Sequence, residues 1–208
     1  MDKIIKTLLG KLQNLSLDGF IIPSCDEFQN EYVPDHLNRL KFFTGFTGSN
    51  GVAIITKNKS VFFTDGRYLN QASNQLSKDY QILDMYEKKS CDIYGELFKA
   101  KSKIGYDGRV ISKKDFDYYQ KLADKHDFKL VSVHENPIDE MWHESRPAPN
   151  NAFIFRMQDS FNGESTESKI ERVLEKMLEL KADCYFVAKP ECVCWLLNIR
   201  GSDISIMP

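Results

Sequence analysis

The sequence has no hydrophobic run long enough to span a membrane and no apolar leader at its start. A spanning helix needs about 20 apolar residues in succession, and the 208 residues contain no such stretch. The first residues, Met1 to Lys6, alternate apolar and charged side chains and lack the cleavage site of a secretory signal. We therefore expect a cytoplasmic protein with no membrane partner.

The cysteines lack the pattern of a disulfide framework. The five cysteines are an odd number without regular spacing. Cys192 and Cys194 are separated by a single residue, which is too close for ordinary zinc-ligand spacing, and no matching His or Cys pair lies nearby. We expect reduced thiols, as in a reducing compartment.

Neither sign of charge is in excess. The 28 Lys and Arg side chains nearly balance the 30 Asp and Glu side chains, which leaves a formal net charge of −2. Proteins that bind polyanions usually carry a basic excess, so the composition predicts no nucleic-acid partner. Lys99, Lys101 and Lys103 alternate with small residues before an apolar segment, and we interpret them as the solvated entry to a strand.

Catalytic signatures are missing as well. The four histidines stand alone, and no His-Glu helical motif occurs, so the sequence predicts no metal ligand. The stretch Gly48-Ser49-Asn50-Gly51 lacks the spacing of a serine-hydrolase elbow. It also leads into a strand rather than a helix, which disfavours a phosphate cradle. We expect no catalytic residue in this chain.

The sequence does contain a regular alternation of helix and strand patterns. This alternation predicts an α/β layered domain with a mixed sheet and flanking helices. Helical spacing of apolar residues covers 4–12, 35–43, 67–76, 93–98, 112–122, 165–180 and 191–197. Short apolar runs typical of strands cover 19–22, 52–55, 61–63, 81–83, 103–106, 128–131 and 184–188, and the second and third form a hairpin.

The composition changes where prolines gather near residue 146. Pro147 and Pro149 fix φ and cannot donate backbone hydrogen bonds, so we expect a domain boundary there. The pattern assigns 1–145 to a first domain, 146–163 to a linker and 164–208 to the start of a second, similar domain. With one clear strand in so short a segment, the second domain is expected to be truncated.

One triplet, Asp65-Gly66-Arg67, stands where a strand ends and a helix begins. Ligand contacts in α/β sheets often lie at such junctions, and an arginine can hold a carboxylate through two hydrogen bonds. Arg67 and the adjacent Tyr68 are therefore candidates for residues near a substrate or partner. The alternative is that Asp65 caps the helix while Arg67 pairs with a nearby acid, and it is favoured because Asp107-Gly108-Arg109 repeats the triplet.

Six short segments carry a family resemblance. Each alone is unspecific, but in this order they resemble the Xaa-Pro aminopeptidase family, in its three-domain aminopeptidase P type, over most of the chain. The segments are 18–24 (DGFIIPS), 30–34 (NEYVP), 44–51 (TGFTGSNG), 63–68 (FTDGRY), 136–139 (NPID) with Trp142, and 195–204 (WLLNIRGSDI).

The resemblance implies a creatinase-like amino-terminal domain, a middle domain of similar kind and a carboxy-terminal "pita-bread" domain with two divalent metals, usually manganese. In the family these metals activate a water that attacks the bond before a proline in second position. Their ligands, two aspartates, a histidine and two glutamates, would all lie beyond Pro208. The chain would then be a non-catalytic portion serving assembly and closure of the substrate cleft.

The same resemblance implies peptide substrates and a homodimer for the full-length enzyme, with no cofactor held by this chain. In the related creatinases, an arginine of the amino-terminal domain reaches the neighbouring active site, which is the looser analogy for Arg67. A competing hypothesis from another class is a stand-alone binding or assembly module that lacks the enzyme domain.

Overall fold

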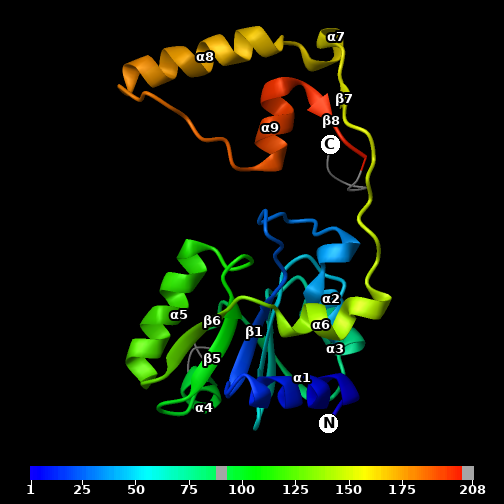
Figure 1. Ribbon diagram of the computed structural model, residues 1–208, viewed down its shortest axis with the longest axis vertical. Helices are drawn as coiled ribbons and strands as arrows, with labels where there is room; N and C mark the ends of the chain where they lie inside the picture. Colours follow the sequence, from blue (N-terminus) through cyan, green and yellow to red (C-terminus); the bar gives the residue numbers. More distant parts are fainter. Residues whose placement is uncertain (88–92, 203–208) are drawn as a thin grey trace. The chain divides into compact units, whose positions relative to one another are not determined.

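The computed structural model describes residues 1–87 and 93–202 (Figure 1). Cys91 and the end of the 195–204 segment lie outside these ranges. The chain divides into two compact units, Met1–Pro147 and Ala148–Pro208.

The first unit is built on one six-stranded mixed sheet. In the order β4-β3-β2-β1-β5-β6, strand β2 is antiparallel to both neighbours and the other pairs are parallel. The expected α/β fold with a mixed sheet and flanking helices is confirmed, including the hairpin of β2 and β3. The strands are β1 (Gly19–Pro23), β2 (Val52–Thr56), β3 (Ser60–Thr64), β4 (Tyr80–Asp84), β5 (Lys103–Asp107) and β6 (Lys129–Val133).

The central strands are apolar on both faces because helices cover the sheet on both sides. Phe20 and Phe62 point to one layer, whereas their neighbours Ile21 and Phe63 point to the other. This alternation follows from the two-residue repeat of a strand. Burying both faces explains why these segments read as continuous hydrophobic runs.

Two groups of helices form the outer layers (Figure 1). Their apolar stripes supply the two halves of the core. One layer consists of α1 (Lys3–Asn14), α2 (Arg39–Thr44), α3 (Leu69–Gln75) and α6 (Pro137–Trp142), and the other of α4 (Ile93–Leu97) and α5 (Lys113–His126).

The expectation of one continuous helix over 35–43 was wrong. The segment forms a single 3-10 turn, Asp35–Leu37, followed by α2. The break falls at Asn38, whose side chain accepts a hydrogen bond of 3.0 Å from the backbone N–H of Lys41 and so caps α2. Gly45 then ends α2 with a φ of 78°, a left-handed conformation that glycine adopts readily.

The second unit is small and largely helical. It contains β7 (Phe155–Arg156), α7 (Asp159–Asn162), α8 (Thr166–Glu179), α9 (Pro190–Leu197) and β8 (Ile199–Arg200), with β7 antiparallel to β8. Lys169 holds α8 to α9: its buried ammonium donates to the carbonyl of Trp195 at 2.8 Å and to Asn198 Oδ1 at 2.5 Å. A cation at the end of α9 also suits the helix dipole.

The strand expected over 184–188 was wrong. These residues are in no ladder, and Tyr185 and Phe186 are 66% and 86% exposed. A strand forms only against a neighbour, and no described segment of this unit pairs with it.

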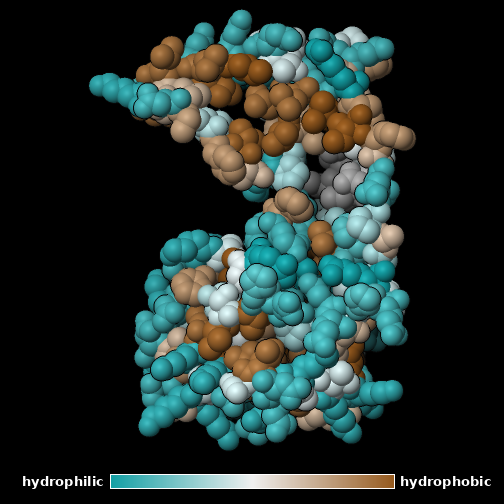
Figure 2. All heavy atoms as spheres, in the orientation of Figure 1, coloured by the Kyte–Doolittle hydropathy of each residue, from teal (hydrophilic) through white to brown (hydrophobic). Residues whose placement is uncertain are grey.

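The apolar side chains of α8 are also exposed, and Figure 2 shows hydrophobic surface over this unit. The most exposed members are Phe153, Ile154, Phe161, Leu174, Leu178, Leu180 and Phe186.

In the described ranges, no helix combines the length and apolar character needed to cross a bilayer.

Candidate functional site

The two Asp-Gly-Arg triplets lie at the same edge of the sheet. Asp65 directly follows β3, and Asp107 is the last residue of β5. Strands β1 and β3 are both antiparallel to β2, and β5 is parallel to β1, so β1, β3 and β5 run in the same direction. The carboxyl ends of β3 and β5 therefore lie at the same edge of the sheet. This is the edge at which open α/β sheets usually bind their ligands.

In the first triplet, Arg67 folds back onto Asp65. Asp65 Oδ1 accepts hydrogen bonds from the backbone N–H of Arg67 at 3.0 Å and from its Nε at 2.9 Å, while Oδ2 accepts from Nη2 at 2.9 Å. Asn50 Nδ2 donates a further bond to Oδ2 at 2.8 Å. The expected acid partner of Arg67 is thus Asp65 itself.

The companion expectation, that Asp65 caps the following helix, was wrong. Helix α3 begins at Leu69, and its N-cap Tyr68 makes no side-chain capping bond. The carboxylate instead receives the N–H two residues on, because an aspartate before glycine forms this local turn readily.

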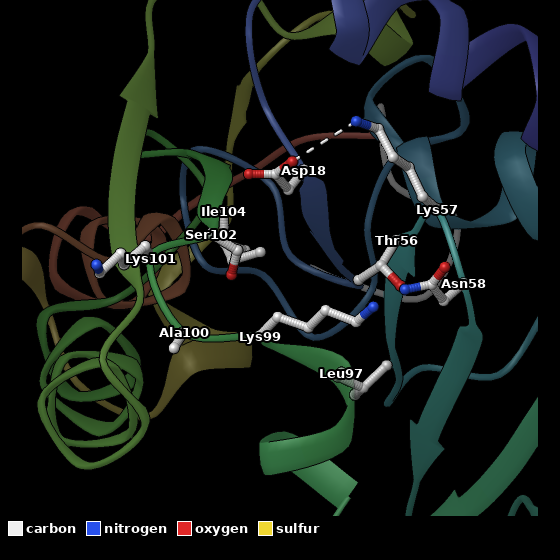
Figure 3. Close-up of a pocket in the computed structure, with 10 residues that line it drawn as sticks. All are labelled: Asp18, Thr56, Lys57, Asn58, Leu97, Lys99, Ala100, Lys101, Ser102 and Ile104. Atoms are coloured by element: carbon white, nitrogen blue, oxygen red, sulfur yellow. Dashed lines mark ion pairs between the residues drawn. The ribbon is translucent and has the colours of Figure 1, made fainter.

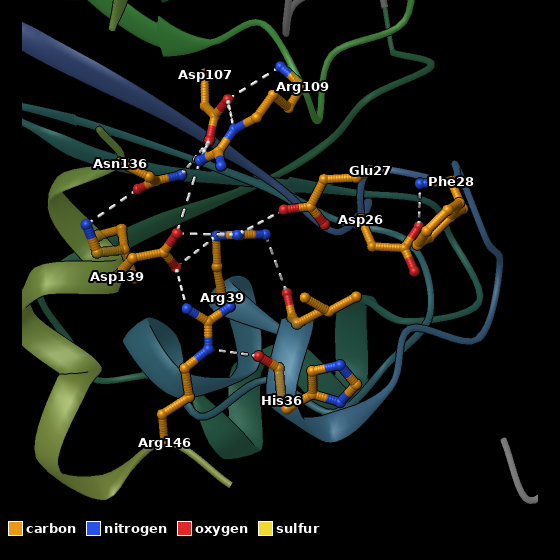
Figure 4. Close-up of polar contacts among 12 residues, drawn as sticks. Asp26, Glu27, Phe28, His36, Arg39, Asp107, Arg109, Asn136, Asp139 and Arg146 are labelled. Atoms are coloured by element: carbon orange, nitrogen blue, oxygen red, sulfur yellow. Dashed lines mark hydrogen bonds and ion pairs between the residues drawn. The ribbon is translucent and has the colours of Figure 1, made fainter. Parts of the chain in front are cut away.

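The second triplet repeats the first almost bond for bond (Figure 4). Asp107 Oδ1 accepts from the N–H and Nε of Arg109 at 2.9 and 3.0 Å, and Oδ2 accepts from Nη2 at 2.7 Å. Here Asn136 Nδ2 occupies the place of Asn50, at 3.1 Å. The sequence repeat therefore encodes one structural unit, in which a carboxylate takes two bonds from an arginine and one from an asparagine.

Each unit exposes the guanidinium of a charge-compensated ion pair to solvent. The Asp65 side chain is 7% exposed and that of Arg67 70%, and the corresponding values for Asp107 and Arg109 are 1% and 50%. Hydrogen bonding to Arg67 holds the pKa of Asp65 well below its usual range. Burial would raise the pKa of Asp107, but the bonds from Arg109 and Asn136 outweigh it and lower this pKa. Both guanidiniums are thus pre-oriented for an anionic group.

Tyr68 ties the first triplet to the glycine-rich stretch. Its hydroxyl is 2.9 Å from the Ser49 hydroxyl, and the Arg67 guanidinium lies 5.2 Å from the centre of its ring. Gly48 must stay a glycine because a Cβ there would lie 2.4 Å from the Phe46 ring. The two residues singled out in the sequence therefore share one surface with the loop that precedes β2.

A buried group of charges, the Arg39 cluster, consists of Arg39, Glu27, Asp139 and Arg146 and lies beside the second triplet (Figure 4). Arg39, 4% exposed, donates to Asp139 at 2.7 and 2.9 Å and to Glu27 Oε1 at 2.7 Å. Arg146 Nη1 lies 3.2 Å from Asp139, and Arg109 Nη2 lies 3.7 Å from it. The cluster joins α2, α6 and the loop after β1.

Sequence reasoning missed the Arg39 cluster. Arg39 and Asp139 are 100 residues apart, and an arginine at the start of a short helix ordinarily faces solvent. The sequence held one weak signal for these residues, because the family segment 136–139 (NPID) contains both Asn136 and Asp139. Only the fold shows that α2 and α6 pack side by side.

A pocket of about 260 Å³ opens at the same sheet edge. Asn50 of the first triplet unit lines it, together with the end of β1, the start of β2 and the α5 residues Asp115 and Tyr119. Cys25 also lines it, and burial, with the charges of Asp115 and Asp26, raises the pKa of this thiol to about 11. A thiol held in its neutral form is a poor nucleophile, so Cys25 offers no catalytic group.

The described residues do not fit the metal centre that the resemblance implies. Among them, no group of three or more His, Cys, Asp or Glu side chains is arranged to hold a metal ion. At this edge Asp65, Asp107 and Asp139 are bonded to arginines instead. The buried Asp26 accepts from the backbone N–H of Phe28 and from Asn30. No hydrolytic step is derived from this chain.

One prediction concerns Asp107 and acid. Its pKa is lowered on folding, so its stabilising contribution is present above the unfolded value of about 4 and is lost as pH falls through the folded value. We expect Asp107→Asn to lower the free energy of unfolding by about 1–3 kcal/mol at neutral pH and by less near pH 3. Urea unfolding at several pH values measures this difference.

The matched control is Asp117→Asn on the exposed side of α5, where the aspartate forms an exposed ion pair with Lys113. That change should have little effect at any pH. An equal loss for Asp107→Asn at neutral and acid pH would contradict the proposed charge interaction.

Two family models match the chain. Residues 4–141 match the Creatinase/Prolidase N-terminal domain, and residues 145–208 match a second model with the same description.

Curated relatives and a solved structure agree with the family models. The chain is 35% identical over 207 residues to a probable Xaa-Pro aminopeptidase P from Laccaria bicolor, covering 96% of this chain and 32% of the relative. It is 34% identical over 194 residues to aminopeptidase P1 from Lotus japonicus, and the match covers 92% of this chain and 29% of that relative. The solved structure of the X-prolyl aminopeptidase of Caenorhabditis elegans superposes with a TM-score of 0.86 at 28% identity, covering 97% of this chain and 35% of that one. That protein is described as a cytosolic enzyme with a di-nuclear active site. The chain spans about a third of each.

Proposed function

We propose a function from one premise: this chain belongs to the family of creatinase/prolidase N-terminal domains. It is the amino-terminal, non-catalytic portion of an Xaa-Pro aminopeptidase, a metallopeptidase that releases the first residue from peptides with proline in second position. The observation that carries the proposal is similarity over 96% of this chain to only 32% of a relative called an Xaa-Pro aminopeptidase P. The catalytic residues then belong to the remaining two thirds of the full-length enzyme.

The exposed apolar surface of the second unit supports a continuing polypeptide. Large apolar side chains rarely remain exposed in such number unless another surface covers them. The segment 184–188 is a continuous apolar run that pairs with no other strand among the described residues, which suits the edge of a sheet. We propose that the rest of the middle domain supplies the neighbouring strand and covers α8.

Arg67 and Tyr68 are proposed to lie near substrate or a partner subunit in the full-length enzyme. Arg67 is the most exposed of the arginines at this sheet edge for which an ion pair is described, and Asp65 fixes its direction. Peptide substrates carry a carboxylate, which a fixed guanidinium can bind. In this proposal the domain closes the substrate cleft and contributes to a homodimer.

Two divalent metals, with manganese the expected identity, would be held outside this chain by the catalytic domain. The di-nuclear site named for the Caenorhabditis elegans enzyme supports the number of metals. Its description as cytosolic, together with the cysteine pattern, supports a cytoplasmic location for this protein.

Activity of two polypeptides tests the proposal. The 208-residue chain should not cleave a peptide with proline in second position, with or without manganese. A chain extended through the catalytic domain should cleave it when manganese is supplied and should lose activity with a chelator. Chelator-resistant turnover by the 208-residue chain would refute the assignment.

The alternative, a stand-alone binding or assembly module, makes a different prediction. Its native polypeptide would end near Pro208, so mass spectrometry of the protein from its own cells would find a species of about 24.1 kDa. The aminopeptidase proposal expects a species roughly three times longer, by proportion with the relatives.

A further inference from the structure

A basic pocket lies at the opposite edge of the sheet from the two triplets, where β1 and β5 begin and β2 ends. Figure 3 shows the residues that line it. Its volume is about 340 Å³, within the range typical of small-ligand sites. Three loops build it: the β2–β3 turn, the residues before β1 and the connection between α4 and β5. The lining residues are Asp18, Thr56, Lys57, Asn58, Leu97, Lys99, Ala100, Lys101, Ser102 and Ile104.

The charges of the pocket are unbalanced. The lining contains three lysines and one aspartate, and that aspartate is already occupied. Asp18 Oδ2 accepts from the Lys103 backbone N–H at 2.9 Å, and Oδ1 lies 3.6 Å from Lys57 Nζ. No ion pair is described for Lys99 or Lys101 among residues 1–87 and 93–202. The pocket therefore carries net positive charge, although the whole chain is slightly acidic.

Side-chain directions favour Lys99 as the main contact. Figure 3 shows its side chain extending along the pocket toward Thr56 and Asn58, while the Lys57 ammonium turns to Asp18. Lys99 thus presents a mobile donor with three N–H groups inside a polar lining.

The connection before β5 holds an unusual backbone. Lys101 has a φ of 66°, a left-handed conformation that a lysine adopts at a cost. The turn is fixed on both sides, because Ser102 N donates to Lys99 O at 3.0 Å and Lys129 N donates to Ser102 O at 2.8 Å. A residue held in a costly conformation by its surroundings is often found at a binding site.

Ser102 supplies an independent observation. Its hydroxyl oxygen is buried and has no hydrogen-bond partner among the described residues. Buried hydroxyls are nearly always bonded, so an unsatisfied one beside a cationic pocket suggests a missing acceptor. An oxyanion in the pocket could serve as that acceptor.

We propose that this pocket binds the phosphate group of a small molecule. Lysine ammonium groups and a hydroxyl suit a phosphate, whereas the lining offers no arginine fork for a planar carboxylate and no aromatic ring for a nucleotide base. The run Lys99-Lys101, interpreted from the sequence as a solvated strand entry, is therefore assigned a binding role. The site is independent of the peptidase proposal.

Nuclear magnetic resonance titration of the 208-residue chain tests the proposal. Inorganic phosphate and glycerol phosphate are added at constant ionic strength, with chloride as the reference anion. We expect saturable shifts confined to residues near 56–58 and 99–104, and about tenfold weaker binding for Lys99→Gln. Ser102→Ala should weaken binding by a smaller factor.

Two further variants separate the effect of charge in the pocket from unfolding of the turn and from nonspecific attraction. Lys101→Asn removes the charge but keeps a residue that tolerates a left-handed backbone, so it should weaken binding without unfolding the turn. Lys114→Gln, an exposed lysine of α5, is the matched control and should bind phosphate as the parent does.

Three outcomes would overturn the proposal. The first is the absence of saturable shifts up to about 50 mM phosphate. The second is equal weakening by Lys99→Gln and Lys114→Gln, which would show nonspecific attraction. The third is binding to vesicles containing phosphatidylserine, lost with Lys99→Gln, without any response to either free phosphate compound. That result would assign the pocket to a membrane surface.

Discussion

Replacing Arg39 with methionine is expected to lower the free energy of unfolding of the first unit by about 3–5 kcal/mol. The change removes both bonds to Asp139 and the bond to Glu27, while the carboxylates stay three-quarters or more buried. Glu27 would be destabilised most, because its second oxygen, Oε2, is buried and has no hydrogen-bond partner within the part of the chain that the structure describes. An uncompensated buried charge costs far more than an intact pair contributes.

Trp142 fluorescence measures this loss directly. Trp142 is 5% exposed and stacks on Phe42 at 4.8 Å, so it reports on the packing of α6 against α2. With Trp195→Phe as background, it is the sole tryptophan of the chain. Urea midpoints of the two proteins then give the difference in stability.

A matched control lies on the same helix. Lys41 pairs with Asp35, and both side chains are well exposed, so Lys41→Met should cost less than about 0.5 kcal/mol. The triple variant with Arg39→Met, Glu27→Gln and Asp139→Asn should recover part of the loss, because it leaves fewer unpaired charges. Equal midpoints for Arg39→Met and Lys41→Met would contradict the role given to the Arg39 cluster.

The first unit was predictable because its elements depend on local patterns. The apolar run over 19–22 predicted β1, and the helical spacing over 112–122 predicted α5, whose N-cap Ser112 accepts from Asp115 N at 3.1 Å. Such signals depend on residues within four positions of each other.

The second unit and the site depend on distant residues, so the sequence predicted them less well. The pattern at 184–188 is typical of a strand, but a strand also needs a partner that no described segment provides. By contrast, an ion pair between Arg67 and a nearby acid is a local feature that the sequence predicted, although it assigned Asp65 to a helix cap rather than to this pair. The Arg39 cluster joins segments 100 residues apart, and only tertiary packing brings them together.

The second large effect is expected for Arg67 in the full-length enzyme. If its guanidinium binds substrate or a partner subunit, Arg67→Ala should lower kcat/KM or the dimer association constant by about tenfold or more, the value typical of a charged hydrogen bond. Steady-state kinetics with a proline-second peptide and analytical ultracentrifugation separate these two effects.

Arg109 provides the matched control for this prediction. Like Arg67, Arg109 donates three hydrogen bonds to its aspartate, which also accepts one from an asparagine, and its side chain is half exposed. A purely structural role for the triplet predicts similar losses of stability for Arg67→Ala and Arg109→Ala, with activity per folded molecule unchanged in both. A functional role predicts that only Arg67→Ala reduces that activity.

Asp65 must be considered in the same experiment. Arg67→Ala leaves a carboxylate that is 7% exposed with bonds only from Asn50 and the backbone, so some stability should be lost in the 208-residue chain. Adding Asp65→Asn removes that buried charge and should restore the melting temperature while leaving activity low. If the double variant instead recovers both the melting temperature and kcat/KM, Arg67 acts only through Asp65, and its proposed contact with substrate or partner is wrong.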